Sequence, residues 1–90
     1  METKNATHWA LYHYVGCPFC WMVTRLIEQE DYPVELRSIH QSAEYRDELI
    51  AGGGRQTVPC LRIELDDGSV QWMYESADIS AYLSHQFNSK

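Results

Sequence analysis

Two cysteines separated by two residues stand where the sequence changes from a strand-like to a helical pattern. Cys17-Pro18-Phe19-Cys20 follows the apolar, aromatic-rich stretch 9–15 and opens the helical pattern. A thiol at a helix N-terminus faces unpaired backbone N–H groups and the positive end of the helix dipole, and both favour the thiolate. Proline fits the first helical turn, because its missing N–H has no partner to lose there. The pattern predicts redox chemistry, with the sulfur of Cys17 exposed and activated and Cys20 one turn deeper on the same face.

Two other uses of this spacing are weighed against redox chemistry. A Cys-x-x-Cys pair also supplies half of a four-ligand zinc site. The remaining candidate ligands are scattered, and no pair among them has ligand spacing: Cys60, His8, His13, His40 and His85. A structural disulfide is typical of cysteine-rich secreted domains, whereas this sequence has three cysteines and no signal-like N-terminus. We therefore expect no metal and a redox-active pair.

Size and charge limit the possible classes of function. Ninety residues suffice for one domain, 1–90, with a single modest core. Thirteen acidic against seven basic side chains give a formal net charge of −6, which argues against nucleic acid because phosphates require a basic face. No run reaches the roughly 18 apolar residues of a membrane span, and the first eight residues are polar. We expect a cytoplasmic monomer that binds neither nucleic acid nor membranes.

The remaining patterns predict the elements that position the two cysteines. Strands are expected at 9–15, 34–39, 60–65 and 70–73, and helices from 18 to about 31, from 42 to 51 and from 76 to about 87. Ser42 and Ser76 are the expected caps, and three glycines, 52–54, end the second helix. The expected inward faces are Phe19, Met22, Val23, Leu26 and Ile27 in the first helix, Tyr45, Leu49 and Ile50 in the second, and Ile79, Leu83 and Phe87 in the last.

The order of these elements predicts the fold class. A strand, helix and strand joined by a short exit turn form a βαβ unit with parallel strands, and 60–73 is a hairpin. The whole order is βαβαββα. It predicts an α/β domain with a four-stranded mixed sheet, helices on both faces and a core of about residues 9–87.

This order, with Cys17-Pro18-Phe19-Cys20 after the first strand and Thr57-Val58-Pro59 before the third, resembles the glutaredoxin branch of the thioredoxin fold. The resemblance covers roughly residues 10–85. It implies a cis Val58–Pro59 bond, with Pro59 against the active-site cysteines. It also implies that Val58 offers its backbone N–H and C=O to the cysteinyl part of glutathione. Phe19 and Thr57 would belong to the same glutathione site.

The start of the last helix departs from the usual glutaredoxin pattern. Glu75-Ser76 is similar to the Glu-Ser pair in the thioredoxin-like N-terminal domain of glutathione transferases and in the larger two-domain glutaredoxins. That resemblance implies that the pair holds the γ-glutamyl end of glutathione at the helix N-terminus. Asp78 matches the acid of the ordinary glutaredoxin turn. Many relatives have a lysine where this chain has Tyr14, so Arg55 is the candidate for the glycine carboxylate of glutathione.

These resemblances predict a small dithiol glutaredoxin that serves electron transport and cell redox homeostasis. The Cys17 thiolate would attack glutathione mixed disulfides and protein disulfides, with glutathione as co-substrate. A second glutathione or Cys20 would then resolve the Cys17–glutathione intermediate. Its partners would be glutathione and glutathionylated or disulfide-containing proteins. We do not expect a complete transferase, which would add a second, all-helical domain.

Two other functions stay open. In an iron–sulfur carrier, two copies would share a cluster through Cys17 and two glutathiones, but relatives that hold clusters commonly replace Pro18. A thioredoxin-like reductant would take electrons from a flavoprotein reductase, but thioredoxins usually have Gly-Pro between their cysteines. Cys60 is expected to be an inert buried thiol, and Trp72 and Tyr74 are expected to be packing residues.

Overall fold

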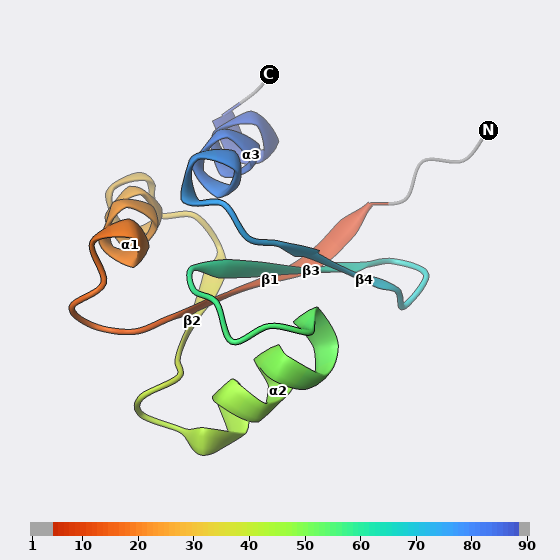
Figure 1. Ribbon diagram of the computed structural model, residues 1–90. Helices are drawn as coiled ribbons and strands as arrows, with labels where there is room; N and C mark the ends of the chain where they lie inside the picture. The colour runs from red at the N-terminus through yellow and green to blue at the C-terminus, as the bar shows by residue number, and fades with distance from the viewer. Residues whose placement is uncertain (1–4, 89–90) are drawn as a thin grey trace.

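The computed structural model describes residues 5–88, which form seven elements in the expected βαβαββα order. The strands are β1 (Ala6–His13), β2 (Val34–Ser38), β3 (Cys60–Leu65) and β4 (Val70–Met73), and the helices are α1 (Pro18–Glu30), α2 (Ala43–Gly53) and α3 (Ser76–Asn88). The strands make one sheet in the order β2-β1-β3-β4, with helices on both faces (Figure 1). No helix among these residues is long and apolar enough to cross a membrane.

Strand β1 lies in the middle of the sheet and determines where the cysteines stand. It pairs in parallel with β2, in a register that aligns His13 with Ser38, and antiparallel with β3, which forms a hairpin with β4. Because helices cover both faces, the central residues Ala10, Leu11 and Tyr12 are all fully buried. The C-terminal end of β1 therefore delivers the chain to the edge of the core, where α1 begins.

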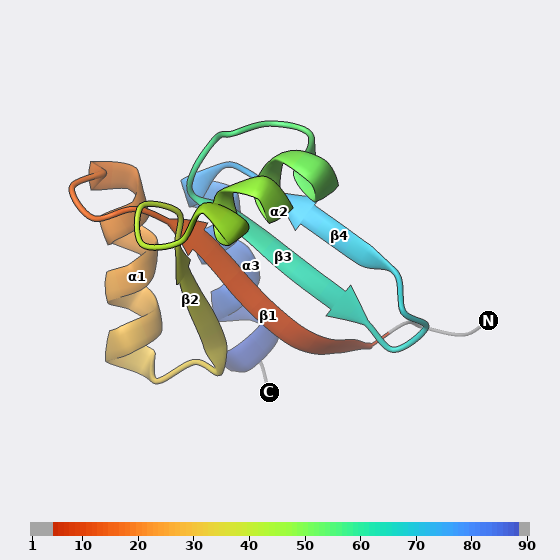
Figure 2. The same cartoon turned by 90° about the horizontal axis from the view of Figure 1, so that it is seen from below.

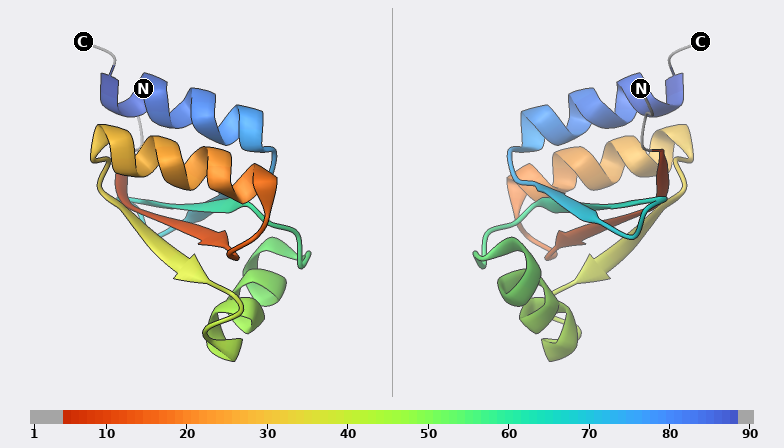
Figure 3. Two further views of the ribbon diagram at one scale, coloured as in Figure 1. Left: turned by 90° about the vertical axis from the view of Figure 1, so that its left-hand side faces the viewer. Right: turned by 90° about the vertical axis from the view of Figure 1, so that its right-hand side faces the viewer.

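The helices form two unequal layers. Helices α1 and α3 pack side by side on one face of the sheet, and α2 lies on the other (Figure 3). Figure 2 shows α2 crossing that second face. The core under α1 and α3 consists of Leu11, Val23, Ile27, Tyr32, Leu61, Ile63, Leu65, Ile79 and Leu83. A smaller core under α2 consists of Tyr12, Ile39, Leu49 and Cys60. The larger core holds α1, and with it the cysteine pair, against the sheet.

The ends of the first two strands differ from the sequence-based prediction. β1 begins at Ala6 and stops at His13 rather than residue 15. The cause is the turn at Gly16, whose φ of 99° is one that glycine adopts without strain. Val15 in this turn is 81% exposed. β2 stops one residue before Ile39, which turns into the smaller core.

Helix α2 also differs at both ends from the prediction. Its N-cap residue Ser42 makes no side-chain hydrogen bond to the helix, so the expected capping interaction is absent. The helix continues through Gly53 instead of ending at residue 51, and Gly54 ends it in the left-handed conformation with φ of 85°.

Three positions predicted to face inward are exposed. Met22 of α1 is 49% exposed and Ile50 of α2 is 43% exposed, so both predictions are wrong. Phe19, counted with the same inward face, is 60% exposed. The buried residues of α1 are Cys20, Val23 and Ile27. This spacing rotates the inward face toward the second cysteine, which takes the place that apolar periodicity gave to Phe19.

The last turn of α2 packs tightly against the strand β4 and the residue that follows it. A methyl group at Gly52 would overlap the indole ring of Trp72, and one at Gly53 would overlap the hydroxyl of Tyr74. The two glycines are thus required by close packing, beyond the helix stop that the sequence predicted. They also set how near α2 lies to the sheet.

We predict that Gly52→Ala destabilises the domain. In an ordinary helix this change stabilises by about 0.5–1 kcal/mol. Here the added methyl group meets Trp72, and overpacking of this kind costs about 1–3 kcal/mol. Urea unfolding followed by circular dichroism measures the change. The control is Asp47→Ala, at an exposed position of α2, which should stay within about 0.5 kcal/mol of the parent. A more stable Gly52→Ala protein would contradict the packing described here.

Candidate active site

Cys17 occupies the N-cap of α1, as the sequence predicted. Its backbone is extended, with φ of −87° and ψ of 117°, and its carbonyl accepts the Trp21 N–H at 2.9 Å. Its Sγ accepts the backbone N–H of Cys20 at 3.5 Å. Pro18 takes the first helical position, where no hydrogen bond is lost. The sulfur therefore lies against the positive end of the helix.

The thiol of Cys17 is less exposed than the sequence suggested. Only 7% of the residue is accessible, so the prediction of an exposed sulfur is wrong. The reason is local, because the sulfur turns back over the helix toward Cys20 and the hydroxyl of Tyr14. Cys17 still lines two hollows, both shared with Trp21, and these leave the sulfur a route to reagents.

The two thiols of the pair have opposite pKa shifts. Burial alone would raise the pKa of Cys17, but hydrogen bonds from Cys20, Phe19 and Tyr14 hold it below its usual value. α1 has no acidic residue in its first turn to repel the thiolate. Burial raises the pKa of Cys20 to about 12, and the bond to Cys17 and the charge of its thiolate add to that effect. These shifts favour the thiolate at Cys17, whereas Cys20 stays protonated at neutral pH.

Tyr14 belongs to the site although the sequence marked it only as the residue that replaces a lysine. Its hydroxyl is hydrogen-bonded to the Cys17 sulfur, and the charge of the thiolate raises the pKa of Tyr14, so that the hydroxyl stays a donor. Its ring stacks on His40, with centroids 4.6 Å apart. The only signal in the sequence was its place three residues before Cys17, at the end of a strand.

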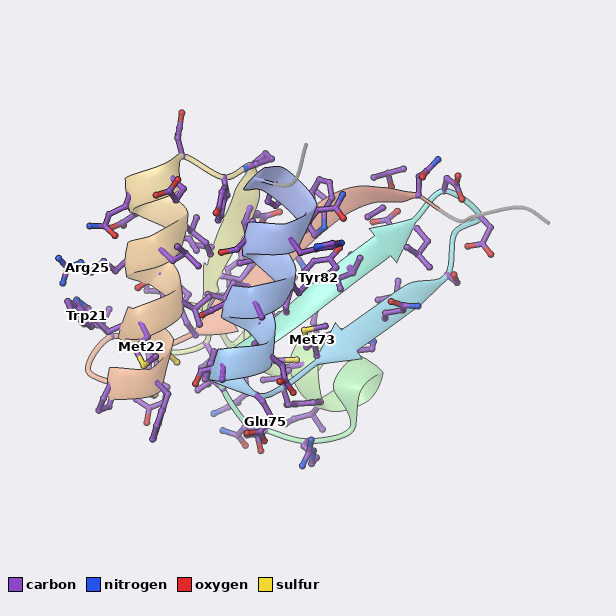
Figure 4. All side chains as sticks on the ribbon, turned by 90° about the horizontal axis from the view of Figure 1, so that it is seen from above. Trp21, Met22, Arg25, Met73, Glu75 and Tyr82 are labelled. Atoms are coloured by element: carbon purple, nitrogen blue, oxygen red, sulfur yellow. The ribbon has the colours of Figure 1, made fainter. Side chains whose placement is uncertain are left out.

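A hollow of about 200 Å³ lies beside the start of α3. Its lining consists of Phe19, Arg55, Thr57, Val58, Pro59, Tyr74, Glu75 and Ser76. Every residue that the sequence assigned to glutathione, other than Asp78, is in this lining, and Asp78 lies in the first turn of α3 outside it. The Val58–Pro59 bond is cis, as the resemblance implied. In Figure 4, Glu75 lies where β4 leads into α3, at the same end of the molecule as the first turn of α1.

The hollow combines a helix N-terminus with a cationic side chain. The carbonyl of Glu75 accepts the Ile79 N–H at 2.8 Å, so Glu75 takes the cap position expected for Ser76, and Ser76 begins the helix. The first N–H groups of a helix attract anions. Arg55 stands over the ring of Tyr74, its Cζ 4.1 Å from the centroid. Tyr74 thus lines the hollow as well as packing, a role the sequence did not indicate.

The third cysteine lines none of the three hollows described above. Cys60 begins β3, is fully buried, and burial raises its pKa to about 11. A buried, protonated thiol is a poor nucleophile, which fits the inert role predicted for it. Among residues 5–88, no three His, Cys, Asp or Glu side chains gather as metal ligands would.

Comparison with known proteins gives the family. The family model described as "Glutathione S-transferase, N-terminal domain" matches residues 11–90. The chain belongs to this family. The glutathione S-transferase N-terminal domain described here has the thioredoxin-like α/β fold predicted from the sequence. No curated protein matches the sequence.

Several solved structures are similar to this transferase N-terminal domain. Leishmania TDR1, a trimeric glutathione transferase, is 26% identical with a TM-score of 0.66, over 86% of this chain and 17% of that chain. A maleylacetoacetate isomerase from Anaeromyxobacter dehalogenans, with GSH bound in its active site, is 22% identical with a TM-score of 0.66, over 91% of this chain and 38% of that chain. Wheat glutaredoxin is 22% identical with a TM-score of 0.60, over 83% of this chain and 69% of that chain. The chain thus spans well under two thirds of the first two proteins.

We predict that iodoacetamide alkylates Cys17 before Cys20 and Cys60. The lowered pKa of Cys17 keeps its thiolate present as the pH falls below the usual thiol range, whereas the other two thiols stay protonated there. Tyr14→Phe removes a hydrogen-bond donor to the Cys17 sulfur, so the alkylation rate of Cys17 should begin to rise at a higher pH in this variant. Tyr45→Phe, on α2, is the control and should leave the profile unchanged. Mass spectrometry of peptides identifies the labelled residue, and first labelling of Cys20 or Cys60 would contradict the assignment.

Proposed function

We propose that this domain is a glutaredoxin-type enzyme, a glutathione-dependent thiol–disulfide oxidoreductase. The observation that carries the proposal is the position of Cys17, whose sulfur lies at the N-cap of α1 with a lowered pKa and a second thiol beside it. Membership of a glutathione-related family supports glutathione as the co-substrate. The substrates would be glutathione mixed disulfides and protein disulfides.

The proposed reaction is a pair of thiol–disulfide exchanges. The Cys17 thiolate attacks the glutathionyl sulfur of a mixed disulfide, and a Cys17–glutathione S–S bond forms as the substrate S–S bond breaks. The substrate leaves as a thiolate and takes a proton from water. A second glutathione, as thiolate, then attacks the glutathionyl sulfur, which releases oxidised glutathione and restores the Cys17 thiolate. With protein disulfides, Cys20 can displace the partner bound to Cys17.

The hollow beside α3 is the proposed glutathione site. Val58 would pair through its backbone with the cysteinyl part of glutathione, beside Phe19, Thr57 and Pro59. Glu75 and Ser76 would hold the γ-glutamyl end, since the helix N-terminus favours a carboxylate. Arg55, steadied over the Tyr74 ring, would hold the glycine carboxylate. Asp78 is proposed with them from the resemblance alone. Holding the tripeptide in this way would align its sulfur for exchange.

Transfer of glutathione to an electrophile is the second candidate. It is supported by the family and by the resemblance to TDR1, a glutathione transferase. The Cys17–Cys20 pair favours exchange, because a second thiol has a use only when a disulfide is made or broken. We expect a cytoplasmic monomer whose partners are glutathione and glutathionylated proteins, although TDR1 is described as trimeric. Relative rates on a small glutathione mixed disulfide and on an aromatic halide separate the two reactions.

We predict that Glu75→Ala raises the KM for glutathione about five-fold and changes kcat little. An ion pair between the Glu75 carboxylate and the ammonium group of the γ-glutamyl end would contribute up to about 1 kcal/mol, which corresponds to that factor. The assay couples reduction of a small mixed disulfide to glutathione, glutathione reductase and NADPH. Glu44→Ala, which removes an acidic side chain from the first turn of α2, is the control and should leave the KM unchanged. An unchanged glutathione dependence would remove Glu75 from the site, and turnover by thioredoxin reductase alone would reject the proposed function.

A further inference from the structure

A cavity of about 250 Å³ lies between α1, β2 and the loop that joins β1 to α1. It is lined by both thiols of the pair, Cys17 and Cys20, and by His13 and Glu28. It shares no residue with the hollow proposed for glutathione. The two thiols thus meet a second set of polar groups, which the exchange with glutathione described above does not use.

The resolving step, in which Cys20 attacks the Cys17–glutathione disulfide, requires a proton acceptor on this side of the site. The incoming, central and leaving sulfurs of a thiol–disulfide exchange lie roughly in line. Cys20 must therefore approach the Cys17 sulfur from the side opposite to the bound glutathione sulfur, which is the side of this cavity. Only a thiolate attacks, but Cys20 is 1% exposed and its pKa is raised to about 12. Its proton needs an acceptor close at hand.

His13 is placed to be that acceptor. It ends β1, is partly buried and lines the cavity together with Cys20. Burial lowers the pKa of His13, and the carboxylate of Glu28 on α1 acts in the opposite direction. The imidazole is therefore neutral near pH 7, the form that takes up a proton. The other titratable groups that line the cavity are Tyr14 and the two thiols.

A buried hydroxyl on the strand next to His13 lacks a hydrogen-bond partner in the described part of the chain. Ser38 is the register partner of His13 on β2, so the two side chains share a face of the sheet. Ser38 is 5% exposed, and its hydroxyl has no hydrogen-bond partner among the described residues. Buried polar groups of this kind are usually satisfied by ordered water. The cavity is large enough to hold several waters, which would link His13 to the thiol of Cys20.

We propose that His13, acting through water in this cavity, accepts the proton of Cys20 when Cys20 attacks the Cys17–glutathione disulfide. The Cys17–Cys20 S–S bond forms as the Cys17–glutathione bond breaks. Glutathione leaves as the thiolate and takes up a proton, and the imidazolium returns its own proton to water. Glu28 steadies the imidazolium while it carries the proton. The inference rests on the proposed function, since it concerns the resolution of the intermediate named there.

The test is a single-turnover measurement of glutathione release. Cys17 is first converted to its glutathione disulfide with oxidised glutathione at low pH, and the protein is then moved to pH 7. Mass spectrometry of acid-quenched samples follows the loss of glutathione as the Cys17–Cys20 disulfide forms. His13→Gln should slow this release about 100-fold, the lower end of the effect of a positioned base. The difference in release rate between His13→Gln and the parent should become smaller at high pH, where hydroxide takes the proton of Cys20. Added imidazole should restore part of the release rate of the variant. His85→Gln, at an exposed position of α3, is the control and should behave as the parent.

The parent protein supplies a second readout that needs no variant. Its release rate should fall as the pH falls through the pKa of His13, because the protonated imidazole cannot accept another proton. Burial holds that pKa below its usual value of 6.5. Release from His13→Gln at the parent rate would overturn the inference. The inference would also be overturned if His13→Gln lowered the release rate by the same factor at every pH and imidazole did not restore it. Such a result would indicate a structural role for His13. If Cys17 never takes up glutathione, the proposed function fails together with the inference. If Cys17 takes up glutathione and His13→Gln releases it at the parent rate, only the inference fails.

Discussion

The hydrogen bond from the backbone of Cys20 to the sulfur of Cys17 is the interaction on which the rest of the site depends. It exists because Cys17 caps α1, which in turn requires the turn at Gly16 and a first helical residue that needs no N–H donor. Helix α1 holds this position because Val23 and Ile27 anchor it in the larger core. A few residues of local geometry therefore lower the pKa of an otherwise ordinary thiol.

The environments of the two thiols have opposite effects on their pKa values. Cys17 receives donors from its own helix and from Tyr14, whereas Cys20, one turn further, is buried and keeps its proton. The surroundings of the pair are divided in the same way. The hollow lined by Val58 and the start of α3 suits an anionic tripeptide, and the cavity lined by His13 suits movement of a proton. In the proposed reaction, attack on a substrate and resolution of the intermediate would take place on separate sides of the Cys17 sulfur.

Much of this arrangement could be predicted from the sequence, because it depends on neighbours along the chain. Element order, the cap at Cys17 and the grouping of Val58 with Ser76 follow from periodicity, turn chemistry and family resemblance. The errors concern features set by tertiary packing. Periodicity cannot fix the rotation of a helix to within one residue, which is why it wrongly predicts an inward-facing Met22. The partial burial of Cys17 depends on side chains such as that of Tyr14, whose direction the sequence does not encode locally.

The central claim is that Cys17 is the nucleophile that takes up glutathione, and mass spectrometry tests it most directly. The Cys20→Ser protein, in which the intermediate cannot be resolved internally, is treated with oxidised glutathione and digested. We predict one glutathione per chain, attached to Cys17 and removed by added glutathione. Attachment to Cys60, or no attachment at all while Cys17 remains reactive to iodoacetamide, would contradict it.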